Sequence, residues 1–326
     1  MSSSQLQEFH SHLRRAKKVV ALVGAGLSAS SGLATFRGTQ GLWKNYNMID
    51  LATPDAFYVD PGLVWQFYSW RRYQALQASP NRGHKALAAL SNVPDLKQCT
   101  INQNVDGLLT RAGHASKHHF QIHGSLFQLK CTSFTCNYVD PANFTHPLTP
   151  ALVGTEFEYQ GQSTRKRRLS HDEHTQNTPK SADSSPQFTP VPQIEEGDLP
   201  RCPRCSSLLR PGVVWFGESL SLHQIHAIDS FIEEGDPPDL ILVIGTSGTV
   251  YPANSYVDRV RFHGGKVAVF NTDIDEPIIN GEVKDTWGFV GDAAETLPEA
   301  LAPLIGEVEE VASTSNSEPA TETKGT

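Results

Sequence analysis

The sequence lacks the features of a membrane protein, a disulfide-stabilised protein and a general nucleic-acid-coating protein. None of its apolar runs approaches the ~20 residues that span a bilayer, and its first twenty residues hold no uninterrupted apolar stretch typical of a secretory signal. Five cysteines among 326 residues are too few for a disulfide scaffold. The 27 Lys and Arg against 35 Asp and Glu give a net charge of −8, which excludes a protein that coats DNA or RNA through positive charge.

Apolar residues are also scarce, at 38% of the chain, whereas Gly and Pro are frequent at 25 and 21 residues. This composition indicates that part of the chain does not contribute to a packed core. The polar residues gather in two stretches, an insertion at about 154–198 and an acidic, Ser/Thr-rich tail at 306–326. We expect most of the insertion and the tail to be disordered.

The remaining chain alternates between buried strands and amphipathic helices. The apolar, β-branched runs predict strands and the runs with helical spacing predict helices. This alternation predicts an α/β fold, with a Rossmann-like doubly wound parallel sheet. The predicted strands are 19–24, 98–104, 240–245 and 266–271, and the predicted helices are 5–18, 62–78 and 84–90.

A glycine-rich turn follows the first predicted strand. Gly24, Gly26 and Ser28 open a helix, where a backbone without side chains and free N–H groups can approach a pyrophosphate. An ordinary strand-to-helix turn is the alternative, because the dehydrogenase pattern G-x-G-x-x-G is absent. Arg37 follows in Thr35-Phe36-Arg37. An arginine in a loop is usually solvated, but beside a phosphate it could act as a clamp.

Four of the five cysteines form two close pairs, Cys131 with Cys136 and Cys202 with Cys205. Four thiolates suit a tetrahedral Zn²⁺, and a closed set of four cysteines is typical of a structural rather than a catalytic site. A redox-active CxxC motif is the alternative, but it would leave the first pair unexplained. We interpret the fifth cysteine, Cys99, as a buried core residue.

These motifs together resemble the sirtuin family of NAD-dependent protein-lysine deacylases. The resemblance covers about residues 15–304 and is carried, in the order of the family, by GAGLSASSGLATFRG at 24–38, QNVDGL at 103–108, IHGS at 122–125, VVWFGE at 213–218, GTS at 245–247 and NTD at 271–273. It implies a Rossmann-like NAD-binding domain, a smaller zinc-binding domain and a helical module. The class III branch, which removes acidic acyl groups, is the most similar subgroup.

The resemblance also implies how the chain is divided. We expect the NAD-binding domain to comprise three separate segments, and the zinc-binding domain to contain the polar insertion. The expected boundaries are 1–37, 96–126 and 208–305 for the NAD-binding domain, 38–95 for the helical module, 127–207 for the zinc-binding domain and 306–326 for the tail.

The reaction site is implied by the same resemblance. It assigns His123 the role of general base, and it places Asn104 and Asp106 at the nicotinamide and ribose side of the cofactor. Taken alone, Asn104 and Asp106 could equally serve turn formation. The catalytic residues are then His123 and Asn104, and the NAD-binding residues are Gly24, Ala25, Gly26, Ser28, Thr35, Phe36, Arg37, Gln103, Asn104, Val105, Asp106, Gly245, Thr246, Ser247, Asn271, Thr272, Asp273 and Ala293.

The implied reaction consumes NAD⁺ as a co-substrate. The acyl oxygen of the substrate attacks C1′ of the nicotinamide ribose, nicotinamide leaves and an O-alkylamidate forms. His123 then accepts a proton from a ribose hydroxyl, which attacks the acyl carbon. The products are free lysine, nicotinamide and O-acyl-ADP-ribose.

The substrate peptide is expected to pair its backbone with the β-prone run 213–218 and with the loop near 248–252, which is strand addition. In this arrangement Val214, Trp215 and Phe216 line the lysine channel, although some of them could be plain core residues. The expected partners are therefore acyl-lysine proteins or peptides, with no membrane and no sequence-specific nucleic acid. We expect the protein to be a monomer.

The acyl group is expected to be acidic. Tyr68 and Arg71 are spaced i and i+3 in a predicted helix, so they share a face, and a guanidinium with a phenol can bind a carboxylate. In the class III branch this pair recognises malonyl, succinyl or glutaryl lysine, and Ala52 matches the small residue that leaves room for the acyl chain. A solvated helix face is the alternative on spacing alone.

Other functions remain open at this point. The chain could be mainly a protein deacetylase, or an NAD-dependent dehydrogenase without the usual glycine pattern. A zinc-ribbon nucleic-acid module is a third possibility, motivated by the cysteine pairs and by RKRR at 165–168, although the acidic charge opposes it. We expect an intracellular location, without distinguishing the mitochondrion from the cytosol or nucleus.

Overall fold

The computed structural model describes residues 3–35, 41–155, 191–246 and 253–308. Several predictions fall outside these ranges: those for Phe36, Arg37 and Ser247, for the loop 248–252, for residues 156–190 of the insertion with its RKRR run, and for residues 309–326 of the tail. These predictions stay as they are, and the description below concerns the other residues.

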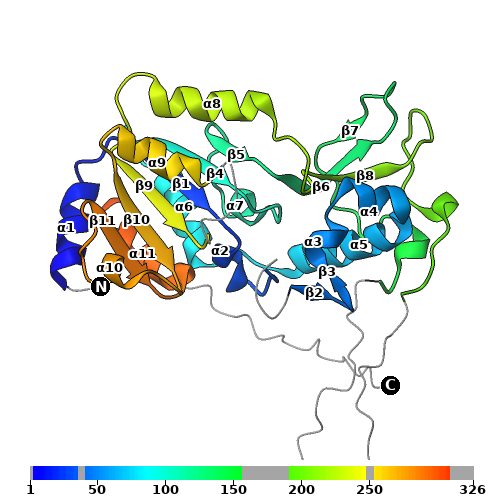
Figure 1. Ribbon diagram of the computed structural model, residues 1–326, viewed down its shortest axis with the longest axis horizontal. Helices are drawn as coiled ribbons and strands as arrows, with labels where there is room; N and C mark the ends of the chain where they lie inside the picture. The colour runs from blue at the N-terminus through cyan, green and yellow to red at the C-terminus, as the bar shows by residue number, and fades with distance from the viewer. Residues whose placement is uncertain (1–2, 36–40, 156–190, 247–252, 309–326) are drawn as a thin grey trace, which may run out of the picture.

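A six-stranded parallel sheet forms the larger part of the protein, which we call the sheet lobe (Figure 1). The strand order is β11-β10-β9-β1-β4-β5, so the chain builds outward from β1 in one direction, returns, and builds outward in the other. The predicted doubly wound parallel sheet is therefore confirmed. The strands are β1 Lys18–Val23, β4 Lys97–Asn102, β5 His119–Gln121, β9 Leu240–Ile244, β10 Lys266–Asn271 and β11 Thr286–Val290.

The central strand shows why the apolar runs predict this sheet. Every residue of β1 is buried, because helices cover both faces of the sheet. Side chains alternate between the faces, so that Val19 and Ala21 belong to one core cluster and Val20 and Leu22 to the other. Cys99, on the neighbouring β4, lies fully buried in the second cluster, as predicted.

Helices from distant parts of the chain cover the two faces. One face carries α1, α6 and α11, and the other carries α8 and α9. The predicted helix 5–18 ends early, because Lys18 already belongs to β1 and its buried ammonium group donates to the carbonyl oxygens of Glu234 and Asp236. No helix within the described ranges combines the length and apolarity needed to cross a membrane. The bounds are α1 Ser3–Leu13, α2 Gly26–Ala29, α6 Arg82–Ser91, α7 Leu108–Arg111, α8 Leu222–Glu233, α9 Ser255–Phe262, α10 Glu276–Ile279 and α11 Ala293–Ile305.

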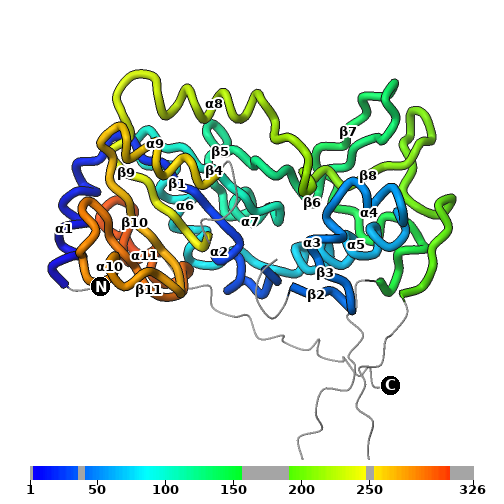
Figure 2. Tube along the Cα trace, viewed as in Figure 1, coloured from blue at the N-terminus to red at the C-terminus, as the bar shows by residue number. Residues whose placement is uncertain are grey.

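A second part of the protein, which we call the small lobe, lies beside the sheet lobe (Figure 2). It combines a three-stranded antiparallel sheet with short helices, and both contribute to one hydrophobic core. Trp65 links the two, because its indole N–H, from the helical part, donates to the Leu209 carbonyl of the sheet at 3.0 Å. The elements are β2 Leu42–Trp43, β3 Tyr46–Asn47, α3 Met48–Leu51, α4 Pro54–Val59, α5 Pro61–Gln77, β6 Gly124–Cys131, β7 Val139–Asp140, η1 Pro150–Leu152, η2 Glu196–Asp198 and β8 Leu209–Val213.

The expected domain boundaries stay a prediction, but two elements lie elsewhere than expected. The strand β8 pairs with β6 in the small lobe, whereas the sequence assigned residues from 208 onward to the NAD-binding domain. The helix α6 packs on the sheet lobe through Leu87 and Leu90, although it belongs to the expected helical module 38–95. Both differences have one cause, because an apolar run or stripe shows that a segment is buried but not against which core.

The end of the insertion is also more ordered than its composition suggests. Residues 191–198 are described, and Val191 and Ile194 pack against the core of the small lobe. The carbonyl of Pro192 accepts a hydrogen bond of 2.8 Å from the Gln66 side chain. Val308, in the predicted tail, similarly packs against the sheet-lobe core. A few apolar side chains are enough to anchor a segment that is polar on average.

Arg72 connects α5 to the small sheet. Its side chain is fully buried and its guanidinium donates to the carbonyls of Leu126, Asn143 and Thr145 at 2.5, 2.9 and 2.9 Å. Burial lowers the pKa of Arg72 to about 10, so the group remains charged at neutral pH. The guanidinium therefore donates to three backbone carbonyls for which no water could take its place.

Arg72→Met is expected to lower the free energy of unfolding by about 3 kcal/mol, because buried carbonyls lose their donor. Urea unfolding followed by circular dichroism measures the change. The matched control is Arg71→Met on the same helix, for which we expect a smaller change because Arg71 is only half-buried. Equal losses in the two variants would contradict the structural role of Arg72.

Candidate active site

The carboxyl ends of β1 and β9 meet where the strand order reverses, which is where open α/β sheets bind ligands. The turn after β1 packs directly on the turn after β9: the Gly24 N–H donates to Ile244 and the Gly26 N–H donates to Gly245, each at 2.8 Å. A Cβ on Gly24 would lie 2.6 Å from the Gly245 oxygen. These glycines are therefore required for contact between two loops.

This packing role adds to the one predicted from the sequence, in which Gly24 and Gly26 let the backbone approach a phosphate; that prediction stays a prediction. Gly26 makes an equally close contact, since a Cβ there would lie 2.7 Å from the Cα of Gly245. The following helix α2 is a single turn of 4 residues, so its dipole is small. From the sequence alone, glycines that are needed for close packing of two loops cannot be distinguished from glycines that leave room for a phosphate.

A cavity of about 460 Å³ lies beside these turns. Its volume is in the range of ligand sites. Six of the residues predicted to bind NAD line it, namely Gly26, Thr35, Gly245, Asn271, Thr272 and Ala293. Asn271 also donates a 3.3 Å hydrogen bond to the Thr246 carbonyl, which brings Thr246 to the same edge. Asp273 is exposed and does not line this cavity, and Ala25 precedes α2 as its N-cap.

The sequence reading missed two polar residues of this cavity. Ser30 and Asp292 both line it, and the Ser30 hydroxyl donates to the Asp292 carboxylate. Asp292 also caps α11 by accepting from the Ala294 N–H at 2.8 Å. The sequence predicted only the neighbouring Ala293 as a site residue.

A buried polar network joins the turns after β1 and β4. The Ser28 hydroxyl donates to the Asp106 carboxylate at 2.7 Å and accepts from the Asn104 amide at 3.1 Å. The same amide donates to the Gly24 carbonyl at 2.9 Å. The structure thus brings together three of the predicted site residues, Ser28, Asn104 and Asp106, all of them buried. Their hydrogen bonds fix each group in one orientation.

His84 completes this network and was not predicted. Its Nδ1 accepts from the Asn81 N–H at 3.3 Å, so its Nε2 carries the proton and donates to Ser28 Oγ at 3.4 Å. Burial lowers the pKa of His84 to about 4, although the nearby Asp106 acts in the opposite direction. His84 is therefore neutral. The sequence predicted a helix over 84–90, but not that its beginning faces the site.

His123 lies between β5 of the sheet lobe and β6 of the small lobe, at the junction of the two. Its Nδ1 is 3.0 Å from the Gln103 carbonyl, so Nδ1 donates and Nε2 remains an acceptor. Burial lowers the pKa of His123, while the bond to Gln103 opposes the shift. A neutral imidazole with a free acceptor nitrogen is what a general base requires.

The segment 213–218 forms one wall beside His123. The Val214 N–H donates to the His123 carbonyl at 2.8 Å, and the Phe216 N–H donates to the Ala52 carbonyl at 2.9 Å. Within the β-prone run 213–218 only Val213 belongs to a strand, because β8 ends there. Gly217 adopts a φ of +88°, which turns the chain and which a strand residue does not adopt. Trp215 is buried, whereas Phe216 is half exposed.

Tyr68 and Arg71 do share one face of α5, and that face is not solvated. Tyr68 is 1% exposed and its hydroxyl accepts from Trp215 Nε1 at 2.9 Å. A side-chain hydrogen bond joins Arg71 to Tyr68. Burial lowers the pKa of Arg71, while Tyr68 and the Asp106 carboxylate raise it, which places Arg71 near the buried network. The alternative of a solvated helix face is therefore wrong for Tyr68, whereas Arg71 is half-buried and hydrogen-bonded to Tyr68.

The four paired cysteines converge in the small lobe. Their sulfur atoms lie within 4.8 Å of one another, with 3.4 Å between Cys131 and Cys205 and 3.7 Å between Cys136 and Cys202. Ligands at about 2.3 Å around a tetrahedral Zn²⁺ stand about 3.8 Å apart, whereas a disulfide needs about 2.05 Å. The sulfur positions thus fit one structural zinc with a closed coordination shell.

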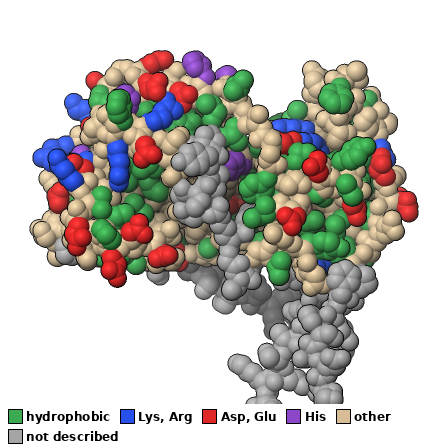
Figure 3. All heavy atoms as spheres, viewed as in Figure 1, with side chains coloured by type: hydrophobic (Ala, Val, Ile, Leu, Met, Phe, Trp, Pro, Cys, Tyr) green, Lys and Arg blue, Asp and Glu red, His purple; other side chains and the backbone are tan. Residues whose placement is uncertain are grey.

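Space-filling atoms show the two lobes with a depression between them (Figure 3).

Comparison with known proteins gives consistent results. A family model described as the Sir2 family matches residues 24–252. An NAD-dependent protein deacylase of Candida albicans is 65% identical, over 94% of this chain and 100% of its own length. The mitochondrial NAD-dependent protein deacylase sirtuin-5 of Canis lupus familiaris is 39% identical, over 92% and 86%.

Solved structures agree with these relatives. A Sir2 homologue in complex with NAD is 33% identical, has a TM-score of 0.66 and is matched over 91% of this chain and 93% of its own. A Sir2 variant with a deacetylated p53 peptide and 3′-O-acetyl ADP-ribose is 25% identical, has a TM-score of 0.63 and is matched over 91% and 97%. Both similarities extend over the two lobes.

Proposed function

The chain belongs to the Sir2 family, and on that premise we propose that it is an NAD-dependent protein-lysine deacylase that removes succinyl, malonyl or glutaryl groups and is a weak deacetylase. The products are free lysine, nicotinamide and O-acyl-ADP-ribose. Relatives named as NAD-dependent protein deacylases support the reaction. Membership of this family replaces the alternatives of a dehydrogenase and of a zinc-ribbon module.

The NAD⁺ site is proposed to extend from the 460 Å³ cavity to the buried network. The cavity residues, such as Asn271 and Thr272, take the adenosine half, and Asn104 and Asp106 take the nicotinamide and ribose half. Ser28 holds these two side chains in place through its hydrogen bonds, and His84 in turn donates to Ser28. Bound NAD⁺ supplies the ribose to which the acyl group is transferred.

His123 is the proposed general base. Its Nδ1–H donates to the Gln103 carbonyl, which leaves Nε2 to accept the proton of a ribose hydroxyl. The substrate peptide is proposed to bind by strand addition along the segment from Val214 to Phe216. The N–H groups of Val214 and Phe216 hold this segment in place by donating to the carbonyls of His123 and Ala52. The lysine side chain would then enter between this wall and the buried network.

The observation that carries the acidic-acyl proposal is the pair formed by the buried Tyr68 and the half-buried Arg71. A guanidinium and a phenol on one face of α5 can bind a carboxylate through several hydrogen bonds. Ala52 lies in the same core as Tyr68, and its carbonyl holds the Phe216 N–H beside the proposed lysine channel. A carboxylate bound here offsets the cost of burying the positive charge of Arg71.

Arg71→Met is expected to raise KM for a succinyl-lysine peptide about tenfold or more, because a charge-assisted hydrogen bond to the substrate is lost. Steady-state turnover of matched succinyl-, malonyl- and acetyl-lysine peptides measures the effect. KM for the acetyl peptide should change far less, since that substrate carries no carboxylate. Wild-type turnover of the acetyl peptide equal to that of the succinyl peptide would instead support a general deacetylase.

The compartment and assembly remain proposals. Vertebrate relatives carry names that place them in mitochondria. For this chain we propose an intracellular location, in the mitochondrion or in the cytosol and nucleus, and a monomeric protein.

A further inference from the structure

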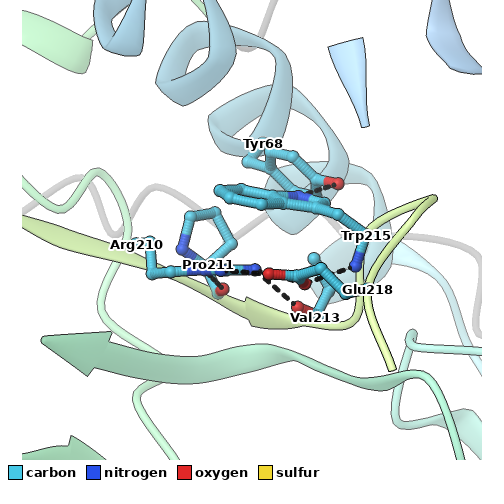
Figure 4. A network of polar contacts seen from close by, with 6 residues as sticks. All are labelled: Tyr68, Arg210, Pro211, Val213, Trp215 and Glu218. Carbon is cyan, nitrogen blue, oxygen red and sulfur yellow. Dashed lines mark hydrogen bonds and ion pairs between the residues drawn. The ribbon is translucent and has the colours of Figure 1, made fainter. Parts of the chain in front are cut away.

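A chain of polar contacts runs from the small sheet to α5 behind the proposed acyl site (Figure 4). It begins at Arg210 on β8, continues through Glu218 and Trp215 in the turn that follows, and ends at Tyr68. Arg210 and Glu218 have no part in the function proposed above. Their contacts nevertheless determine how the acyl site is built.

Arg210 and Glu218 form a two-pronged ion pair. Nη1 and Nη2 of Arg210 donate to Oε1 and Oε2 of Glu218 at 2.6 and 2.8 Å. Glu218 Oε2 also accepts the Trp215 backbone N–H at 2.8 Å, and Arg210 Nη2 donates to the Val213 carbonyl at 3.1 Å. Burial alone would raise the pKa of Glu218, but the bonds from Arg210 and Trp215 lower it overall. The ionised pair therefore fixes the turn after β8.

The same pair holds the indole ring of Trp215. The guanidinium carbon of Arg210 lies 3.5 Å from the ring centroid, and Phe57 packs against the indole with centroids 5.2 Å apart. Trp215 is 3% exposed. Its Nε1–H donates to the Tyr68 hydroxyl oxygen at 2.9 Å. The stacked guanidinium and the hydrogen-bonded backbone N–H of Trp215 thus keep the indole N–H directed at the Tyr68 oxygen.

The polarity of the Tyr68 hydroxyl follows from its partners. Trp215 Nε1 and Arg71 are donors without acceptor capacity, so the Tyr68 oxygen accepts both hydrogen bonds. Burial raises the pKa of Tyr68 to about 12, against the opposing influence of Arg71 and Trp215, so the phenol keeps its proton. With its oxygen accepting twice, the group has its O–H left to donate. A carboxylate is an acceptor for that proton.

We infer that Arg210 and Glu218 are positioning residues for acidic-acyl recognition: by fixing the Trp215 indole N–H on the Tyr68 oxygen, they direct the Tyr68 O–H toward the acyl carboxylate. The inference rests on the proposed function, because it requires Tyr68 and Arg71 to receive an acidic acyl group. The preference among acyl groups then depends on an ion pair that does not touch the acyl group.

Arg210→Met and Trp215→Phe test this inference with succinyl- and acetyl-lysine peptides of one sequence. The ratio of kcat/KM for the succinyl peptide to that for the acetyl peptide is expected to fall about fivefold to tenfold in each variant, as for the loss of one hydrogen bond. The fall should come mainly from KM for the succinyl peptide, since ground-state binding is weakened. Arg210→Lys keeps the charge without the two-pronged geometry and should produce a smaller fall.

The matched control is Arg259→Met. Arg259 is also half-buried, pairs with Asp229 at 2.6 Å and with Glu233, and lies 5.3 Å from the Tyr256 ring centroid, but it is on α9 of the sheet lobe. The peptide ratio should be unchanged in this variant. Thermal midpoints and zinc content establish that each variant is folded, and Glu218→Gln replaces Arg210→Met if the latter does not fold.

The outcomes separate the inference from the function on which it rests. A ratio that falls in Arg71→Met but stays at the wild-type value in Arg210→Met, Glu218→Gln and Trp215→Phe overturns the inference and leaves the proposed function in place. A wild-type protein without preference for the succinyl peptide, together with an unchanged ratio in Arg71→Met, overturns both.

Discussion

Replacing His123 by alanine is expected to lower the deacylase kcat by about 10²–10⁴-fold, which is the usual contribution of a positioned general base. The bond from Nδ1 to the Gln103 carbonyl fixes the tautomer, so that only Nε2 can accept the proton. NAD⁺ binding should remain measurable, because the 460 Å³ cavity is lined by other residues. Single-turnover deacylation of a succinyl peptide, with calorimetric titration of NAD⁺, measures the two effects separately.

The pH dependence gives an independent check on the same residue. The pKa of His123 is lowered by burial below the ordinary value of 6.5, although Gln103 opposes the shift. A base works only when unprotonated, so kcat/KM should stay near its plateau at neutral pH and fall only as the pH drops below 6.5. A midpoint above 7 would contradict this assignment. The matched control is His226→Ala on α8, an exposed histidine whose loss should leave turnover unchanged.

The sheet lobe could be predicted from the sequence because its strands are buried on both faces. The runs that include Val19–Val23 and Leu240–Ile244 are continuously apolar, and the structure pairs them in parallel at the centre of the sheet. The family and the zinc cluster were likewise predictable. Motifs and cysteine spacing are local in sequence, and each constrains one loop.

The shape of the small lobe could not be predicted in the same way. Its core joins residues as distant as Trp43, Leu129 and Leu209, and no periodicity within one segment reveals such a union. His84 escaped notice for a similar reason, since it reaches Ser28 across 56 positions of the chain. Long-range side-chain bonds carry no local pattern.

Two adjacent arginines on α5 show most clearly what could not be predicted from the sequence. Arg71 and Arg72 are identical in type, yet Arg71 bonds Tyr68 at the proposed acyl site and Arg72 donates to the carbonyls of Leu126 and Asn143 in the small lobe. A rotation of about 100° per residue along a helix separates these two environments. The spacing of Tyr68 and Arg71 indicated a shared face, but only the packed structure shows which face is buried.

Removing the zinc ion is expected to abolish deacylation while leaving the sheet lobe folded. The four sulfurs join the β6 end of the small sheet to the Cys202–Cys205 turn, which leads directly into β8. Structural zinc contributes apparent free energies of about 10–16 kcal/mol in small domains. Without the zinc ion, β8 and the residues from Arg210 to Trp215 are no longer held in place. The sheet lobe retains two core clusters of its own.

Dialysis against a chelator should therefore reduce turnover more than 100-fold, a magnitude set by loss of the substrate wall rather than of one contact. Circular dichroism should show a partial loss of structure with one remaining cooperative transition. Atomic absorption should find one zinc per chain in the wild type and none in Cys202→Ala, while Cys99→Ala, a buried thiol of the sheet lobe, should keep one. Activity that survives complete zinc removal would show that the small lobe does not need the ion.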